Sequence, residues 1–276
     1  MLSSLVRNTA RWGTPALALG LALSAGCTTT IYQESRTVEV PHRPGLGLDA
    51  QTHNGALTAR AATGEGSENV RINATIRARS RDRLSAVLVD ADRDDLGNLV
   101  VRVLWPEPTG PRSAEGCDLV ILIPDAVGVT LETHNGAITT GGLAGPLSAR
   151  TSNGAIDVQA HAGPVNVKTS NGRIEIRGAA GPFEATTSNG AITLDIPDGS
   201  QGAFSLKTSN GAVTVTVPRD FAGSVTPSTS NGAITVVEPS GGPKEFTARK
   251  GNPVWPGGPA STISTSNGSI TIRKRP

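Results

Sequence analysis

Thr151-Ser152-Asn153-Gly154 is one copy of a four-residue motif that recurs along much of the chain. Six copies have the sequence Thr-Ser-Asn-Gly, and two have His in place of Ser, at 52–55 and 133–136. The Asn residues of these motifs are Asn54, Asn135, Asn153, Asn171, Asn189, Asn210, Asn231 and Asn267. Steps of 18 positions join the four from 135 to 189, and two steps of 21 follow. A fixed period of this kind predicts a solenoid, in which each repeat is one coil stacked on the last.

Each motif precedes a short run of alternating apolar and polar residues, such as 156–159 (Ile-Asp-Val-Gln). A second such run, 165–168 (Val-Asn-Val-Lys), follows an Ala-Gly-Pro segment. We therefore expect two short strands and two turns in each coil of 18–21 residues. Equivalent strands of successive coils would pair in parallel, about 4.8 Å apart. The predicted fold is all-β: a parallel β-solenoid of two sheets, preceded by irregular N-terminal coils.

The apolar positions of the repeats predict two columns that face each other across the core. One column is expected to contain Ile138, Ile156, Ile174, Ile192, Val213, Ile234 and Ile270. The other is expected to contain Leu147, Val165, Phe183, Phe204 and Val225. The last motif lies 36 positions after Asn231, which is two periods, so a degenerate copy is expected near 247–250.

Stacking would place identical corner residues above one another. Thr hydroxyls are then expected to bond backbone groups, and Asn side chains to form an amide ladder. Gly is expected because the turn would need a positive φ angle, which a residue without Cβ adopts freely. A central rung such as Asn171 should contribute more stability than Asn267, which is expected at the edge of the stack. The basic residues 273–275 would guard that open edge.

The N-terminus resembles a bacterial lipoprotein signal. Arg7 and Arg11 precede a short apolar segment, and Leu23-Ser24-Ala25-Gly26-Cys27 has the order of a lipobox. The resemblance implies cleavage before Cys27, lipidation of its thiol, and export to the cell envelope. Thr28, rather than Asp, follows the lipidated residue and implies the outer membrane.

The predicted organisation has three parts. Residues 1–26 form the signal peptide, and 27–45 form the lipidated Cys and a flexible tether. Residues 46–276 form one solenoid domain, irregular over 46–130 and regular over 131–276. Strands are expected in the irregular part at 70–79, 84–89, 99–104 and 119–123. This part also contains a basic stripe, formed by Arg71, Arg77, Arg79, Arg81 and Arg83. The acidic residues between positions 90 and 95 are expected to balance its charge.

Charge and cysteine content argue against several functions. Removing Arg7 and Arg11 from 25 basic residues leaves 23, against 23 acidic residues, so the mature chain is neutral. Nucleic acid is therefore not an expected partner. Cys117 is expected to be a small buried hydrophobe. The turns lack the Asp ligands of calcium β-rolls, so neither a metal nor any other cofactor is expected.

Signal, irregular strands and Thr-Ser-Asn-Gly-x-Ile-x-Val coils together resemble the bacterial putative-adhesin family of β-strand-repeat proteins. The resemblance covers residues 46–275 and implies a β-solenoid on an exported protein. Its pattern contains no catalytic residues, so it implies adhesion rather than catalysis.

We expect a non-enzymatic envelope or surface lipoprotein that acts as an adhesin or scaffold, with a protein or glycan ligand. One alternative is a polysaccharide-cleaving β-helix enzyme, whose acids would be Asp157 and Glu175 on neighbouring coils. No cleft-forming insertion interrupts the coils, which argues against it. Another alternative is an envelope-stress or signalling accessory that binds a partner protein. His53 and His134 could bind a metal only if their coils were adjacent.

Overall fold

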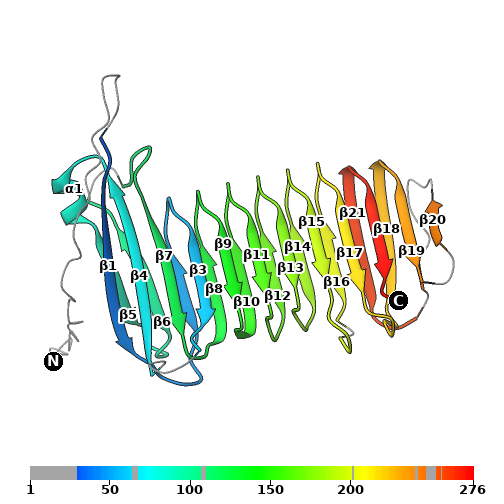
Figure 1. Ribbon diagram of the computed structural model, residues 1–276, viewed down its shortest axis with the longest axis horizontal. Coiled ribbons are helices and arrows are strands. Elements are labelled where there is room, and N and C mark those ends of the chain that lie inside the picture. Colours follow the sequence, from blue (N-terminus) through cyan, green and yellow to red (C-terminus); the bar gives the residue numbers. More distant parts are fainter. Residues whose placement is uncertain are drawn as a thin grey trace.

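The computed structural model describes residues 30–63, 68–106, 110–200, 202–239, 242–246, 253–255 and 257–276. Over these residues the chain forms an elongated stack of coils, whose strands make up two sheets, as the repeats predicted (Figure 1). The signal peptide with Cys27, and the degenerate copy near 247–250, lie outside the described residues. No helix of the described part is both long enough and apolar enough to cross a bilayer.

Among the described residues, the first sheet has 12 strands in the spatial order β1-β4-β7-β3-β9-β11-β13-β15-β17-β22-β19-β20. Their bounds are β1 Tyr32–Pro41, β3 Leu57–Ala61, β4 Asn69–Ala78, β7 Gly116–Ile123, β9 Ile138–Gly141, β11 Ile156–Gln159, β13 Ile174–Arg177, β15 Ile192–Asp195, β17 Val213–Val217, β19 Ile234–Glu238, β20 Gly242–Phe246 and β22 Ile270–Lys274.

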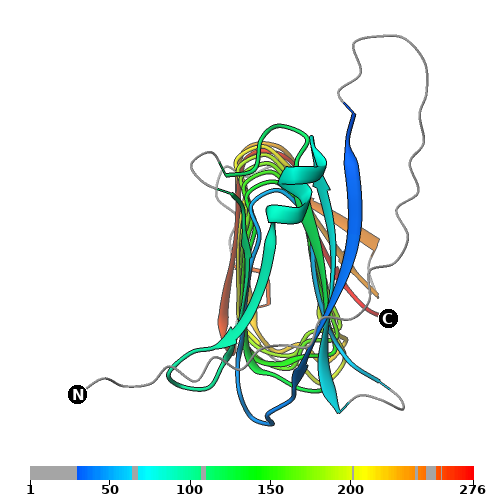
Figure 2. The same ribbon diagram turned by 90° about the vertical axis from the view of Figure 1, so that its left-hand side faces the viewer.

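The second sheet has 10 strands in the described residues, in the order β18-β21-β16-β14-β12-β10-β8-β2-β6-β5. Their bounds are β2 Leu48–Gln51, β5 Leu88–Arg93, β6 Leu99–Leu104, β8 Val127–Glu132, β10 Ala144–Arg150, β12 Val165–Lys168, β14 Phe183–Thr186, β16 Phe204–Lys207, β18 Ser224–Asn231 and β21 Ala260–Asn267. Pairing is parallel in the body of both sheets, and antiparallel pairs occur towards the ends. Seen along the stack, the sheets face each other and helix α1 (Arg81–Ala86) lies at the N-terminal end (Figure 2).

The core is formed by the two predicted columns. Ile156 is fully buried and pairs in register with Ile138 on one side and Ile174 on the other. Val165 is paired in the same way with Leu147 and Phe183 in the second sheet. Each inward side chain therefore packs above an equivalent one, which is why an apolar residue recurs at these positions in nearly every regular coil.

The corner residues join each coil to the next through side-chain hydrogen bonds. Thr151 is buried, and its hydroxyl donates to the carbonyl of Gly136 at 2.9 Å. Asn171 donates its amide to Asn153 at 2.8 Å and accepts from Asn189 at 2.9 Å. Equivalent bonds connect all eight motif Asn residues into a continuous ladder. The motif residues form the hydrogen bonds at the corner, and the strand residues form the apolar core. The repeat therefore contains the residues for both kinds of contact between coils.

The conformational reason expected for the corner Gly was wrong. No corner Gly or Asn has a positive φ in the described residues. A Cβ added to Gly154 would instead lie 1.8 Å from the carbonyl oxygen of Gly136, so the constraint is the close approach of successive backbones. Positive φ values occur at the other turn, at 143° for Gly163 and 151° for Gly181.

The stacking order at the C-terminal end also differs from the sequence order. The last coil, β21 with β22, is inserted between the coil of β16 and β17 and the coil of β18 and β19. In Figure 1 the red strands accordingly lie between yellow and orange ones. Asn267 is therefore an interior rung, which donates to Asn210 at 2.9 Å and accepts from Asn231 at 2.8 Å. Ser261 separates Phe204 from Val225 in the second column, and its buried hydroxyl accepts from the Phe204 N–H at 3.1 Å.

The expectation that 273–275 guard the end was wrong for the same reason. Arg275 follows β22 in the inserted coil and reaches past β17 to form ion pairs with Asp195 and Asp198. Its backbone N–H donates to the carbonyl of Val217 at 3.0 Å. These contacts attach the C-terminal segment to coils in the interior of the stack.

Two predictions for the chain before the regular repeats, one for the tether and one for the irregular part, were also wrong. Tyr32–Pro41 is not a flexible tether but strand β1, which pairs along its whole length with β4 and covers an otherwise open edge. The strand expected at 84–89 begins as helix α1, because Ser80 caps it by accepting from the Arg83 N–H at 3.2 Å. Residues 99–104 and 119–123 are strands, as predicted.

We predict that Asn171→Ala and Asn267→Ala each lower the free energy of unfolding by about 1–2 kcal/mol, and Asn231→Ala by about half as much. The reason is that each interior rung takes part in two ladder bonds and the terminal rung in one. Urea unfolding of the three variants measures this, with Ser170→Ala as a control at the same corner. A loss at Asn267 that is no larger than the loss at Asn231 would contradict the observed stacking order.

We predict that Arg275→Ala lowers the stability by about 1 kcal/mol or less, because its ion pairs are partly exposed. Arg273→Ala is the matched control, since Arg273 is exposed and forms no ion pair within the described residues. Thermal melting and sedimentation of both variants provide the measurement. Neither should self-associate more than the wild type, and an increase for either would restore the end-guarding role.

Candidate functional site

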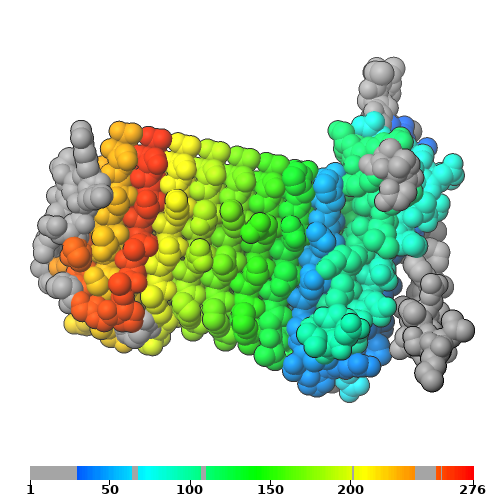
Figure 3. Space-filling model, turned by 180° about the vertical axis from the view of Figure 1, so that it is seen from behind, coloured from blue at the N-terminus to red at the C-terminus, as the bar shows by residue number. Residues whose placement is uncertain are grey.

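A groove of about 970 Å³ runs along the outer face of the second sheet. Figure 3 shows this face, on which the strands of successive coils lie as parallel columns. Seven neighbouring strands, from β2 to β21, contribute to the lining, so the groove crosses the coils and follows the long axis of the stack. Its length and direction fit an extended ligand better than a small molecule.

Outward side chains of the strands line the groove with polar groups. One position in each coil supplies them, here named the groove row: Asp49, Thr130, Ser148, Asn166, Glu184, Ser205 and Thr262. The prolines of the second turn, Pro146, Pro164 and Pro182, border the row. Because side chains alternate along a strand, the same register that buries Leu147 and Val165 fixes this row on the outside.

Five of the seven groups of the groove row already have a partner within the fold. Asn166 donates its amide to Glu184 at 3.2 Å, and Asp49 pairs with Arg102 at 2.6 Å. Thr262 donates its hydroxyl to Ser205 at 3.4 Å, and the exposed hydroxyls of Thr130 and Ser148 have no partner among the described residues. No outward aromatic side chain stands on this face among the described residues, and no Ser-His pair that could activate a nucleophile lines the groove. The arrangement can therefore form hydrogen bonds with a ligand.

Asp157 and Glu175 lie on the opposite sheet. They are partners in register on β11 and β13, as their spacing predicted. Each carboxylate interacts along its own strand: Asp157 accepts from Gln159 at 3.1 Å, and Glu175 forms an ion pair with Arg177. Neither residue lines the groove. Their proximity alone does not make a catalytic pair.

His53 and His134 are adjacent, because the coil of β2 and β3 stacks directly on that of β8 and β9. Their rings stack at a centroid distance of 5.1 Å and an interplanar angle of 2°. Parallel rings direct their nitrogens side by side rather than towards one point. No group of three or more His, Cys, Asp or Glu that could hold a metal occurs in the described residues.

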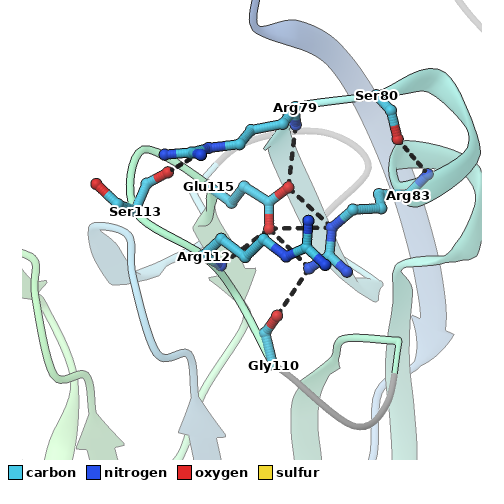
Figure 4. A network of polar contacts seen from close by, with 7 residues as sticks. All are labelled: Arg79, Ser80, Arg83, Gly110, Arg112, Ser113 and Glu115. Atoms are coloured by element: carbon cyan, nitrogen blue, oxygen red, sulfur yellow. Dashed lines mark hydrogen bonds and ion pairs between the residues drawn. The ribbon is translucent and has the colours of Figure 1, made fainter. Parts of the chain in front are cut away.

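A buried ionic network lies at the N-terminal end of the stack, and no sequence pattern predicted it (Figure 4). The Glu115 side chain is completely buried and accepts from Arg83 Nη2 at 2.7 Å. The backbone N–H groups of Arg79 and Arg112 donate to it at 3.0 and 2.9 Å. Burial alone would raise the pKa of this carboxyl, but these donors outweigh it and lower the pKa to about 2.

The basic stripe is therefore balanced by different acids from those expected. Arg83 pairs with Glu115, Arg77 with Asp118, and Arg71 with Glu39, so the acids of 90–95 are not the partners of these three. Glu115 was missed because it follows a turn, Arg112 to Ala114, with no periodic pattern.

Cys117 is fully buried, as predicted. Burial raises the pKa of its thiol to about 12. The thiol is therefore protonated at neutral pH and acts as a small apolar side chain.

A comparison with known protein families finds a match within the repeat region. A domain of unknown function, DUF7330, matches residues 147–239. No curated protein sequence shows a significant match. Among the solved structures that resemble the chain are a putative adhesin from Bacteroides fragilis and a putative cell adhesion protein from Clostridium sporogenes.

The first of these structures has a TM-score of 0.44 and 14% identity, and covers 87% of this chain and 97% of its own. The second has a TM-score of 0.35 and 9% identity, and covers 87% of this chain and 100% of its own.

We predict that Glu115→Gln lowers the free energy of unfolding by about 3 kcal/mol, because it leaves Arg83 without its buried partner. Glu39→Gln makes the same chemical change at a half-exposed pair and should cost less than about 1 kcal/mol. Denaturant unfolding at neutral pH compares the two variants.

The pH dependence provides a second check. The pKa of Glu115 is lower in the folded state than its ordinary value of 4.5. Its contribution is therefore fully present above pH 4.5 and is lost as the pH falls towards about 2. Melting curves of Glu115→Gln should lack this part of the acid destabilisation, and curves parallel to the wild type would refute the assignment.

Proposed function

We propose that the protein is a non-enzymatic adhesin or scaffold of the cell envelope, which holds an extended ligand along the groove of its second sheet. The observation that carries this proposal is the groove itself, which is continuous over seven adjacent strands and receives one polar outward side chain from each. A ligand that crosses many coils gains many weak hydrogen bonds at once. It needs no deep pocket and no bond-breaking group.

Attachment to the membrane completes the proposal. The lipobox resemblance implies a lipid on Cys27, and β1 begins at Tyr32, so four residues separate them. Four residues span at most about 14 Å when extended. A lipid there would hold the β1 end of the stack close to the bilayer, in keeping with export to the outer membrane.

Binding without turnover tests the function. Purified protein is applied to a panel of immobilised polysaccharides and proteins, and bound material is assayed for cleavage. Ser148→Trp, which fills the groove, should weaken binding about tenfold. Thr193→Trp is the matched control, since Thr193 has the equivalent outward position on the first sheet.

Two outcomes would contradict the proposal. If wild type, Ser148→Trp and Thr193→Trp bind equally well, the groove is not the binding site. Polysaccharide cleavage that Asp157→Ala or Glu175→Ala abolishes would make the protein the glycan-cleaving enzyme instead.

A further inference from the structure

Three cations stand in one row beside the groove. Arg150, Lys168 and Lys207 occupy the last outward position of β10, β12 and β16, here named the cation row. Each lies two residues beyond the groove row on its strand, which is about 6.6 Å. All three are exposed, and none forms an ion pair or side-chain hydrogen bond within the described residues.

The spacing of the row follows the coils. Arg150 and Lys168 are on adjacent strands, about 4.8 Å apart at the backbone, and Lys207 is two strands further on, past Thr186. Like charges at this spacing repel one another, so the row is unfavourable unless solvent, salt or a ligand neutralises it.

Acidic groups near the row do not neutralise it. Glu132 is the register neighbour of Arg150, yet the two form no ion pair in the structure. Glu184 lies in the groove row and accepts from Asn166. Asp49, at the far end of the groove, is already paired with Arg102. The stretch from β10 to β16 therefore presents three free cations and one acid.

The absence of outward aromatic side chains on the described part of this face restricts the ligand further. Neutral sugars are commonly held by stacking on aromatic rings, which this face does not offer. Hydrogen bonds and charge must then supply the affinity. Small hydroxyls in the groove row fit the hydroxyls of a carbohydrate, and the cation row fits acid groups.

We propose that the ligand is an anionic polysaccharide that lies along the stack. Its carboxylate or sulfate groups contact Arg150, Lys168 and Lys207, and its hydroxyls bond the groove row. This inference rests on the proposed function and specifies the chemistry of its ligand. A periodic polymer suits a surface in which equivalent groups recur at a fixed spacing.

Binding of chemically matched probes tests the inference. Dextran sulfate and polygalacturonate are the anionic probes, dextran is the neutral parent of the first, and polyglutamate represents an acidic protein. The triple variant Arg150→Gln, Lys168→Gln, Lys207→Gln should bind the anionic polysaccharides at least about tenfold more weakly. Added salt should weaken wild-type binding, and should affect the triple variant less.

A control variant has the same change in net charge on the opposite face. Its substitutions are Arg60→Gln, Arg173→Gln and Arg273→Gln, at exposed residues without ion pairs in the described part of the chain. It should bind as the wild type does. Equal losses in the two triple variants would show only general electrostatic attraction and overturn the proposal.

Other outcomes also overturn it. If dextran binds as tightly as its sulfate, and Ser148→Trp still weakens binding, the groove function stands but the anionic class is wrong. If polyglutamate binds as tightly as both polysaccharides, the partner is an acidic protein. If neither anionic polysaccharide binds, the cation row is not a ligand site.

Discussion

The structure depends on close contact between successive backbones at the corner of each coil. A Cβ on Gly154 would overlap the carbonyl of Gly136, and the same holds at the equivalent glycines along the stack. This contact brings the Thr hydroxyl within reach of the Gly carbonyl and sets the Asn amides one above another. The strands that leave the corner then pair in register, so the inward column and the outward rows follow from one geometric requirement.

Much of the fold could be predicted from the sequence because the repeat pattern determines the length of each regular coil and which of its side chains point inward. The period gave the coil length, alternation gave the two columns around Ile156 and Val165, and repetition of Asn gave the ladder. The stacking order could not be predicted. Every regular corner has the same Thr, Ser, Asn and Gly residues. The corners of Asn231 and Asn267 could therefore stack on that of Asn210 equally well, although the structure has Asn267 there.

The N-terminal part contains a second feature that could not be predicted from the sequence, the buried pair of Glu115 and Arg83. Glu115 and Arg83 are far apart in sequence, and their pairing depends on how β4, α1 and β7 pack. Charged residues at such positions look like ordinary surface residues until burial is known. The candidate site lies between these cases. The period and the alternation place Arg150, Lys168 and Lys207 in one outward column, as the structure has them. The groove beside them was not predicted, because the shape of an exposed face does not follow from the period.

The ladder has a direction. In all seven bonds the amide N–H₂ points towards the β1 end and the carbonyl towards the β18 end. Aligned amide dipoles add rather than cancel, and each bond polarises the next. The corner is therefore electrically asymmetric along the long axis, with a partial positive pole at Asn54 and a partial negative pole at Asn231. Any molecule that meets the two poles encounters opposite fields, although the repeats between them are chemically alike.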